Sequence, residues 1–423
     1  MKRRMTVGFR SPLRRARVWG VVLALVAALP AGAGQEVTVA GVVHVKNGPS
    51  PSEGRQTLEL EKLWSAGGED DEVLFGLISQ VRTDEEGNLY LLDTQLSEVK
   101  VFSPSGRLVK TLSREGEGPG EVRLPIDLLF MPGGSLGLVQ SFPGKIVQVD
   151  REGHPAGTFT IGGADAAQGG FVLMLDALAR GEDLVIAGMQ IQMKPDGTGQ
   201  TRTRILASYG MDGREKVRYA SSSTEIDLQN FRVVERDDYF VFPRRWAIDA
   251  QGRIYAPIER DRYAITVYNP DGSVARVIER EFSPPKRSPI ELARVQSVID
   301  AQRRQVPIEF HVDLAETEPA IARIQVREGG EIWVAHSGSH RDQPEGVLMT
   351  YDVFDPSGHF VRQVSIACQG NRDNDGLFFL GPDRVLLVKG LADAAMALQG
   401  AGSSAAGEEE AEPMEIVCYR IRG

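Results

Sequence analysis

The chain has 423 residues, of which 42% are hydrophobic and 25% are charged, a composition typical of a globular protein. Its net charge is −10, and it becomes −17 without residues 1–34, which carry seven of the 48 Lys and Arg and none of the 58 acidic residues. Binding nucleic acid through its phosphates requires clustered positive charge, so we expect no nucleic-acid partner.

The N-terminus, residues 1–34, has the layout of a secretory signal peptide. Basic residues precede the apolar run Val18–Leu29, and the small residues Ala31-Gly32-Ala33 follow it. This run is too short to cross a bilayer as a helix, which takes about 20 residues. We therefore expect export to the periplasm or the cell exterior, with no membrane span after cleavage. An uncleaved membrane anchor is the alternative.

From residue 57 onward one pattern recurs along the chain. An apolar strand, a tight acidic-Gly turn, a second strand, a connection, a third strand, a turn such as "NPDG" and a fourth strand follow one another. The copies are Ile78–Leu112, Ile126–Ile161, Phe171–Tyr219, Trp246–Ile278, Ile321–Ile366 and Gly376–Ile421. Four antiparallel strands per repeat predict an all-β fold, a six-bladed β-propeller over residues 57–423.

The sixth copy lacks a fourth strand. The segment Thr57–Trp64, "TLELEKLW", has the pattern of a strand and no neighbouring partner in the sequence. We expect it on the outer edge of the last blade, where it would close the ring and remove two exposed sheet edges. Residues 35–56 then form an N-terminal extension.

The glycine-rich stretch "REGEGPGEVRLP", residues 114–125, could be a phosphate loop or a crossing between blades. A phosphate loop needs a helix directly after its glycines, and here "VRLPIDLLF" predicts a strand. We therefore expect a crossing, with Glu117 and Glu121 either solvated or paired with Arg114 and Arg123.

This stretch, the repeat before it and the segment "GVVHVKNGP" at residues 41–49 resemble bacterial exported six-bladed β-propeller proteins related to NHL-repeat propellers. The family's glycine motif is followed by Phe, whereas this chain has Val122. The resemblance implies the fold and export, and it implies no settled reaction.

Strand connections differ in length at the two ends of the predicted blades. One end receives only tight turns, whereas the other receives every long segment: residues 190–200, 220–245, 281–319, 337–346 and 391–413. Variable loops on a rigid scaffold usually carry binding, so we expect the ligand at the long-connection end. Within it, Ser288, Pro289 and Glu291 form a capping box that predicts a helical insertion near 288–305.

Seven residues are candidates for a ligand-binding face at this end: Asp93, Arg123, Arg244, Arg245, Trp246, His336 and His340. An Arg pair beside an aromatic ring suits an anionic or carbohydrate ligand, although a rim ion pair with nearby acids is the alternative. The two histidines could act as acid and base or as ligands, or simply form a polar rim.

Asp93 ends a second strand, where it is either a turn residue or part of a site at the channel mouth. Propellers of the gluconolactonase type hold a divalent metal with Glu, Asn and Asp near the axis, and no matching trio is evident. Cys368 and Cys418 either form one disulfide or remain two buried thiols. We expect neither a metal nor another cofactor.

The sequence therefore predicts a monomeric, exported binding or scaffold module. It would present its loop-rich face to a protein, peptide or glycan. The alternative is a metal-assisted lactonase, hydrolase or lyase at the channel mouth.

Overall fold

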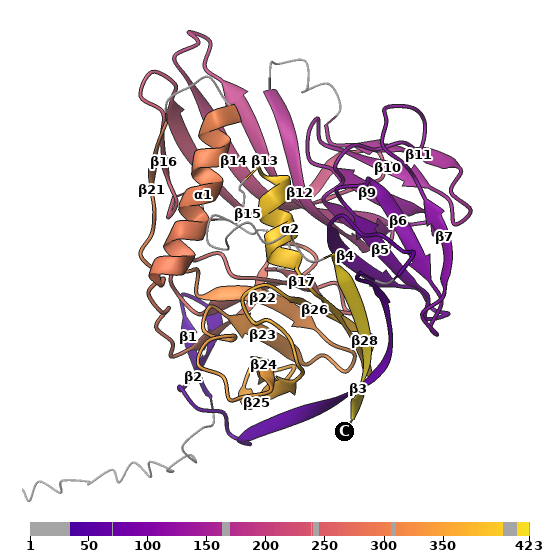
Figure 1. Cartoon of the computed structure of the whole chain (residues 1–423). Helices are drawn as coiled ribbons and strands as arrows, with labels where there is room; N and C mark the ends of the chain where they lie inside the picture. The colour runs from indigo at the N-terminus through magenta and orange to yellow at the C-terminus, as the bar shows by residue number, and fades with distance from the viewer. Residues whose placement is uncertain are drawn as a thin grey trace, which may run out of the picture. The chain divides into compact units, whose positions relative to one another are not determined.

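The structure is a computed structural model of the whole chain (Figure 1). It describes residues 34–423 except 70, 163–169, 238, 240–244, 306–309, 401–412 and 423. Residues 1–33, which make up all but the last residue of the predicted signal peptide (1–34), and Arg244 lie outside the described residues. The described chain is all-β with two helices, as the alternating sequence pattern predicts.

The first two repeats each form a four-stranded antiparallel sheet, with strand orders β4-β5-β6-β7 and β11-β10-β9-β8. Their strands are β4 (Ile78–Thr83), β5 (Leu89–Asp93), β6 (Glu98–Phe102), β7 (Leu108–Leu112), β8 (Asp127–Phe130), β9 (Leu136–Gln140), β10 (Lys145–Val149) and β11 (Pro155–Thr160). The glycine-rich stretch joins β7 to β8, so it is followed by a strand and connects two sheets. It is therefore a crossing, as expected.

The third repeat has longer strands. They are β12 (Gly170–Arg180), β13 (Asp183–Met193), β14 (Gly199–Tyr209) and β15 (Glu215–Asp227), paired in that order. The segment 190–200, expected to be a long connection, is mostly strand because the β13–β14 ladder continues to the pair Met193 and Gln200. Backbone pairing along this hairpin satisfies polar groups that a loop would leave to water.

The fourth repeat is extended by an N-terminal hairpin. The sheet order is β1-β2-β20-β19-β18-β17, and the strands are β1 (Gln35–Val39), β2 (Val42–Asn47), β17 (Ala247–Ile248), β18 (Ile254–Ala256), β19 (Ala264–Tyr268) and β20 (Val274–Arg280). Strand β2 runs parallel to β20, with His44 opposite Val277. Nothing in the local sequence pattern predicts this partner.

The last two repeats share one eight-stranded sheet. Its order is β22-β23-β24-β25-β3-β28-β27-β26, with β3 (Arg55–Gly67), β22 (Ile321–Val326), β23 (Ile332–His336), β24 (Val347–Phe354), β25 (Phe360–Ala367), β26 (Gly376–Leu380), β27 (Arg384–Val388) and β28 (Glu415–Arg422). Strand β3, which contains Thr57–Trp64, pairs antiparallel with β28 and parallel with β25 (Figure 1). It thus covers the free edges of both neighbours.

The tight turns repeat one hydrogen-bonding scheme. In the turns that begin at Asp84, Asp150, Asp249 and Asp355, one carboxylate oxygen accepts the backbone N–H groups two and four residues later. A glycine with positive φ follows three residues after each Asp. The turn chemistry is therefore local, because side chain and backbone of the same five residues make it.

Two helices and a small parallel pair lie beyond the sheets, at the end reached by the upper ends of β13 and β14 in Figure 1. They are α1 (Pro289–Gln305), α2 (Leu391–Leu398), β16 (Arg232–Val234) and β21 (His311–Asp313). The capping box is formed: Ser288 Oγ accepts the Glu291 N–H, and Glu291 accepts the Ser288 N–H. The helix predicted near 288–305 is confirmed, whereas α2 lies in a segment expected to be loop.

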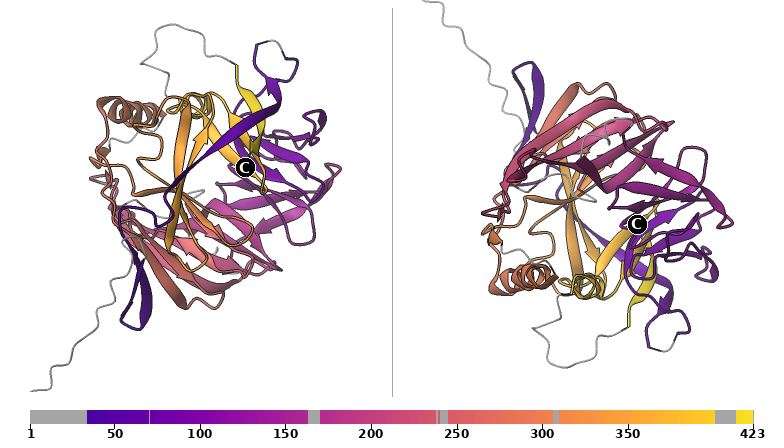
Figure 2. Two further views of the ribbon diagram at one scale, coloured as in Figure 1. Left: turned by 90° about the horizontal axis from the view of Figure 1, so that it is seen from below. Right: turned by 90° about the horizontal axis from the view of Figure 1, so that it is seen from above.

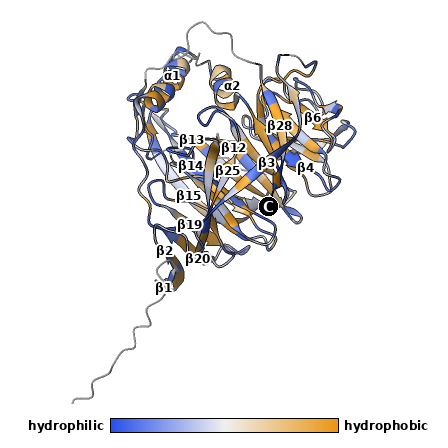
Figure 3. Cartoon of the chain, turned by 60° about the horizontal axis from the view of Figure 1, so that its bottom comes forward, coloured by the Kyte–Doolittle hydropathy of each residue, from blue (hydrophilic) through white to orange (hydrophobic). Residues whose placement is uncertain are grey.

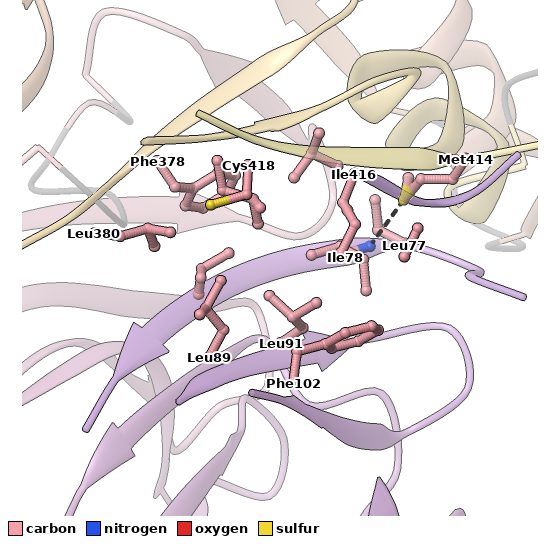
Figure 4. Close-up of a cluster of buried hydrophobic side chains, with 14 residues drawn as sticks. Leu77, Ile78, Leu89, Leu91, Phe102, Phe378, Leu380, Met414, Ile416 and Cys418 are labelled. Carbon is pink, nitrogen blue, oxygen red and sulfur yellow. Dashed lines mark hydrogen bonds between the residues drawn. The ribbon is translucent and has the colours of Figure 1, made fainter. Parts of the chain in front are cut away.

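Figure 2 shows the sheets from two further sides, and Figure 3 shows the hydrophobic residues along their strands. Buried apolar side chains form clusters within and between the sheets. In one cluster, Leu91 and Phe102 of the first repeat pack with Ile416 and Cys418 of the last (Figure 4). Both cysteines are buried free thiols, and burial raises the pKa of the Cys418 thiol to about 11. No described helix is long and apolar enough to cross a membrane.

Candidate functional site

The candidate site is the long-connection end of the sheets, which carries α1, α2 and the connections from second to third strands and between sheets. Asp93 lies there, at the end of β5, and its side chain is fully buried. Its carboxylate accepts the N–H groups of Gly76, Leu77 and Leu96 at 2.8–3.1 Å. Both oxygens are therefore occupied in holding two neighbouring loops, which matches the turn-residue alternative.

His336 occupies the equivalent position at the end of β23. Its ring packs on Phe282 with centroids 4.5 Å apart, and its Nδ1 accepts the Gly338 N–H at 3.0 Å. Its Nε2 lies 3.9 Å from the buried carboxylate of Asp352, which also accepts hydrogen bonds from Tyr263 and Arg280 at 2.8 Å. Burial lowers the pKa of His336 below the ordinary value, so the neutral ring is favoured near neutral pH.

His340 lies in the next connection, against the start of α1. Its Nε2 is 3.9 Å from Glu291, and Glu291 also accepts a hydrogen bond from Arg341 at 2.6 Å. Burial and the Arg341 charge lower the pKa of His340. Both histidines therefore contact neighbouring elements: His336 contacts Phe282 and Asp352, and His340 lies against the start of α1.

The Arg245-Trp246 segment precedes β17. Arg245 lies over the Tyr239 ring, 5.5 Å from its centroid, and burial lowers the pKa of Arg245. Trp246 is 2% exposed and is not part of the outer surface of the long-connection end. It packs in a core cluster with Tyr219 and Tyr268, and it also borders the cavity described below.

Arg123 lies in the glycine-rich crossing and is half exposed. Its guanidinium pairs with Glu117 at 3.1 Å, and Arg114 pairs with Glu121 at 2.6 Å. These two pairs follow the predicted partners. The Glu121 carboxylate also accepts the Gly118 N–H, and this bond together with Arg114 lowers the pKa of Glu121.

A buried ion network ties the long connections together, and the sequence did not reveal it. Glu235, after β16, accepts hydrogen bonds from Arg287 at 2.6 Å and from Arg260 at 3.0 Å, and it also accepts the Ala315 N–H. Arg287 bonds to Glu318 as well. Both arginines are less than 9% exposed. Residues far apart in the chain thereby fix the insertions relative to one another.

The same end exposes a row of large apolar side chains on neighbouring connections and at the start of β12. Its members, the apolar row, are Leu74, Leu96, Leu124, Phe142 and Phe171, which are 40–70% exposed. The Leu124 N–H donates to Ser97, beside Leu96, and the rings of Phe142 and Phe171 meet edge to face at 5.4 Å. The loops therefore follow one another in space from the first repeat to the third. The sequence did not predict this row, because its members are single apolar residues in separate segments.

A cavity of about 350 Å³, open to solvent, lies at the opposite, tight-turn end. Its lining comes from β4, β8, β12, β22, β26 and the Trp246–Ile248 segment, one piece from each of the six repeats. Most of these lining residues belong to the first strand of a repeat, close to the tight turn that follows it; Trp246 directly precedes its strand. Six segments distant in sequence thus surround one space.

Among the described residues, no group of three or more His, Cys, Asp and Glu is placed to hold a metal ion.

No protein-family model and no curated protein matches the sequence. Solved structures that are similar include a member of the duf4221 family from Bacteroides vulgatus, with 11% identity, 86% of this chain and 99% of that chain covered, and a TM-score of 0.47. Virginiamycin B lyase from Staphylococcus aureus has 10% identity, 85% and 99% coverage and a TM-score of 0.40. The calcium-binding protein regucalcin from Agrobacterium tumefaciens has 12% identity, with 87% of this chain and 97% of that chain covered, and a TM-score of 0.40.

Proposed function

We propose that this protein is an exported six-bladed β-propeller that binds a polypeptide partner at its long-connection end. Six first strands or strand segments around one cavity support the blade number, and the pairing of β3 with both β25 and β28 supports closure of the ring. The basic, apolar and small-residue pattern of residues 1–34 supports export.

The apolar row is the observation that carries the proposed binding function. Exposed leucines occur singly on most proteins, whereas here five large apolar side chains are exposed at one end of three successive repeats. Such patches, rimmed by polar residues, are typical of protein interaction sites. Here the rim includes the ion pair of Arg123 and Glu117.

A polypeptide with apolar side chains suits this surface better than a glycan. Glycans present hydroxyl groups that need hydrogen-bonding partners, whereas the exposed atoms of Leu74, Leu124 and Phe142 offer none.

Selection from a random twelve-residue peptide library tests this proposal. We expect enrichment of peptides with Leu, Phe, Tyr or Trp at two or more positions. Leu124→Lys and Phe142→Lys should each weaken binding of the selected peptides about tenfold, because a lysine in an apolar contact must be desolvated.

The matched control is Met211→Lys. Met211 is 41% exposed but lies in the tight turn between β14 and β15, at the other end. Binding by this variant should equal that of the unmodified protein. Peptides that bind Leu124→Lys and Phe142→Lys as well as the unmodified protein would refute the proposal.

The enzyme alternative makes a different prediction. A metal-assisted lactonase, hydrolase or lyase would retain about one divalent ion per chain, and chelation would lower its melting temperature. Elemental analysis of the purified protein before and after chelation therefore separates the two functions.

A further inference from the structure

The chain before β3 crosses from the fourth repeat to the fifth. Residues 35–54, from the start of β1 to the residue before β3, form what is called the strap below. Its strand β2 runs parallel to β20 of the fourth repeat (Figure 3). Beyond β2, the Ser52 N–H donates to the Phe360 carbonyl at 3.1 Å, and the Gly54 carbonyl accepts the Gln363 N–H at 3.1 Å. Both of these partners belong to β25, so one short segment is bonded to two repeats.

The chain itself joins these two repeats only through a long connection. Residues 281–320 separate β20 from β22, whereas residues 113–126 separate β7 from β8 and residues 368–375 separate β25 from β26. A long connection restricts the relative position of its two ends less closely than a short one. The strap therefore supplies a second link between the fourth and fifth repeats.

Asn47, the last residue of β2, lies where the strap meets both repeats, and it is 4% exposed. Its Nδ2 donates to the Glu279 carbonyl of β20 and to the Gly358 carbonyl of the β24–β25 turn, each at 2.9 Å. Its Oδ1 accepts the Phe360 N–H at 2.8 Å. Both ends of the amide are thus occupied, and the side chain has partners in the fourth and in the fifth repeat.

These partners require an amide at position 47. An ionised carboxylate donates no hydrogen bond, so an aspartate would bring a charged oxygen against the Glu279 and Gly358 carbonyls. A buried charge that faces only acceptors is costly, because no donor replaces the water it has lost. The junction therefore accepts asparagine and opposes aspartate.

The residue after Asn47 makes this exchange chemically accessible. Gly48 follows it, and this is the only Asn-Gly pair in the sequence. Asn-Gly pairs deamidate readily, because glycine has no Cβ to hinder its backbone nitrogen. That nitrogen loses its proton and attacks Cγ of the asparagine, the Cγ–Nδ2 bond breaks, and ammonia leaves. Water then opens the succinimide ring to aspartate or isoaspartate.

We propose that Asn47 is a deamidation site whose modification releases the strap. While the strap is docked, hydrogen bonds hold both ends of the amide, so the reaction requires them to break first. An opened chain has no such protection. Once residue 47 carries a carboxylate, the strap cannot re-form its bonds, and the change is permanent because ammonia has left. The proposal is independent of the binding function, since the strap shares no residue with the apolar row.

Peptide mapping by mass spectrometry tests the chemistry. The folded protein and the guanidinium-unfolded protein are incubated in the same mildly alkaline buffer. We expect Asn47 to deamidate about tenfold or more slowly in the folded protein, because only the opened fraction reacts. Asn230, which is exposed and precedes Phe231, is the internal control and should stay intact in both samples. Equal rates at Asn47 in the two samples, or no reaction in the unfolded chain, would refute the proposal.

Asn47→Asp places the product of the reaction in the chain, and amide hydrogen exchange measures its effect. We expect residues 42–54 and 358–363 to exchange about tenfold faster or more, and the first repeat, residues 78–112, to keep its exchange rates. Asn230→Asp is the matched control, because it adds the same charge at an exposed position. Unchanged exchange in the strap, or equal acceleration throughout the chain, would contradict release of the strap.

Gly48→Ala keeps Asn47 and provides a second test if Asn47→Asp does not fold. A Cβ at Gly48 would have no atom within 4 Å, so the folded structure accepts it. Both proteins are held unfolded for the same time and then refolded. We expect the deamidated fraction of the unmodified protein to be missing from the refolded pool or to exchange faster in the strap, whereas Gly48→Ala should match freshly prepared protein. Identical behaviour of the two proteins would overturn the proposal.

Discussion

The tight-turn end and the long-connection end are built from different kinds of contact. At the tight-turn end, residues within five positions of one another make the turns, as the repeated bonds of Asp84 and Asp249 show. At the long-connection end, Glu235 joins Arg260, Arg287 and Ala315, which lie 25–80 positions away in the chain. Local chemistry thus forms one end, and tertiary contacts form the other.

The largest expected effect tests the non-local network. Glu235→Gln removes the charge that faces two buried arginines, so we expect the free energy of unfolding to fall by about 3 kcal/mol. Urea denaturation followed by circular dichroism measures it. Glu316→Gln is the control, because the Glu316–Lys286 pair is exposed at about three quarters of each side chain and should contribute little to the free energy of unfolding. If the free energy of unfolding falls equally in Glu235→Gln and Glu316→Gln, the buried network stabilises the fold no more than an exposed ion pair does.

The next effect tests a tight turn. Gly213 has φ +76°, and a Cβ there would lie 2.4 Å from the Thr160 carbonyl oxygen. Gly213→Ala should therefore cost about 3 kcal/mol, from left-handed strain and from displaced backbone. Gly181→Ala has φ +57° with no atom within 4 Å of the added carbon, so strain alone should cost about 1 kcal/mol. Equal costs in thermal and urea unfolding would contradict the steric argument.

A smaller effect is the dependence of the free energy of unfolding on pH, which should differ between the two ends. Burial lowers the folded-state pKa of His336, so protonation favours the unfolded chain, and stability is lost as pH falls through and below about 6.5. At the tight-turn end burial raises the pKa of Asp84, but hydrogen bonds from Asn88 and Tyr90 outweigh it and lower the pKa. That contribution is lost only as pH falls below about 4.

The measurement is the urea midpoint between pH 7 and pH 3 for the unmodified protein, His336→Gln and Asp84→Asn. His336→Gln should flatten the curve between about pH 6.5 and 5, and Asp84→Asn should flatten it only below about pH 4. An unchanged slope above pH 5 in His336→Gln would mean that His336 does not set the acid response of the long-connection end.

The smallest effect on stability comes from the exposed apolar side chains. Leu124→Lys and Met211→Lys should each change the free energy of unfolding by less than about 0.5 kcal/mol, because neither side chain is buried. Only Leu124→Lys should reduce the fluorescence of bound 8-anilinonaphthalene-1-sulfonate, since Leu124 belongs to the apolar row, whereas Met211 is not part of any such row among the described residues. Equal dye binding by the two variants would remove the distinction between the ends.

Much of the fold followed from short-range signals. Alternating apolar residues located the strands of all six repeats, and Ser288 with Glu291 located the start of α1. Other elements had no such signal. The hairpin of β1 and β2 binds β20 through backbone pairing some 230 positions away, and backbone groups are the same in every residue.

The site was harder to predict for the same reason. Asp93, His336 and His340 lie at the expected end, but their partners come from other connections, and those partners hold loops instead of facing an open site. The apolar row became visible only when separate loops met. Trp246 was singled out beside an arginine, yet it lines the cavity at the other end.

The sequence by itself determined most strands of the repeats, their tight turns and the helix after Ser288, because each depends on residues close together in the chain. Only the tertiary structure decided which loops share a surface, which charges are buried together and which side chains surround the cavity. Those properties depend on distances between segments that are remote in sequence, and an isolated segment carries no record of its distant neighbours.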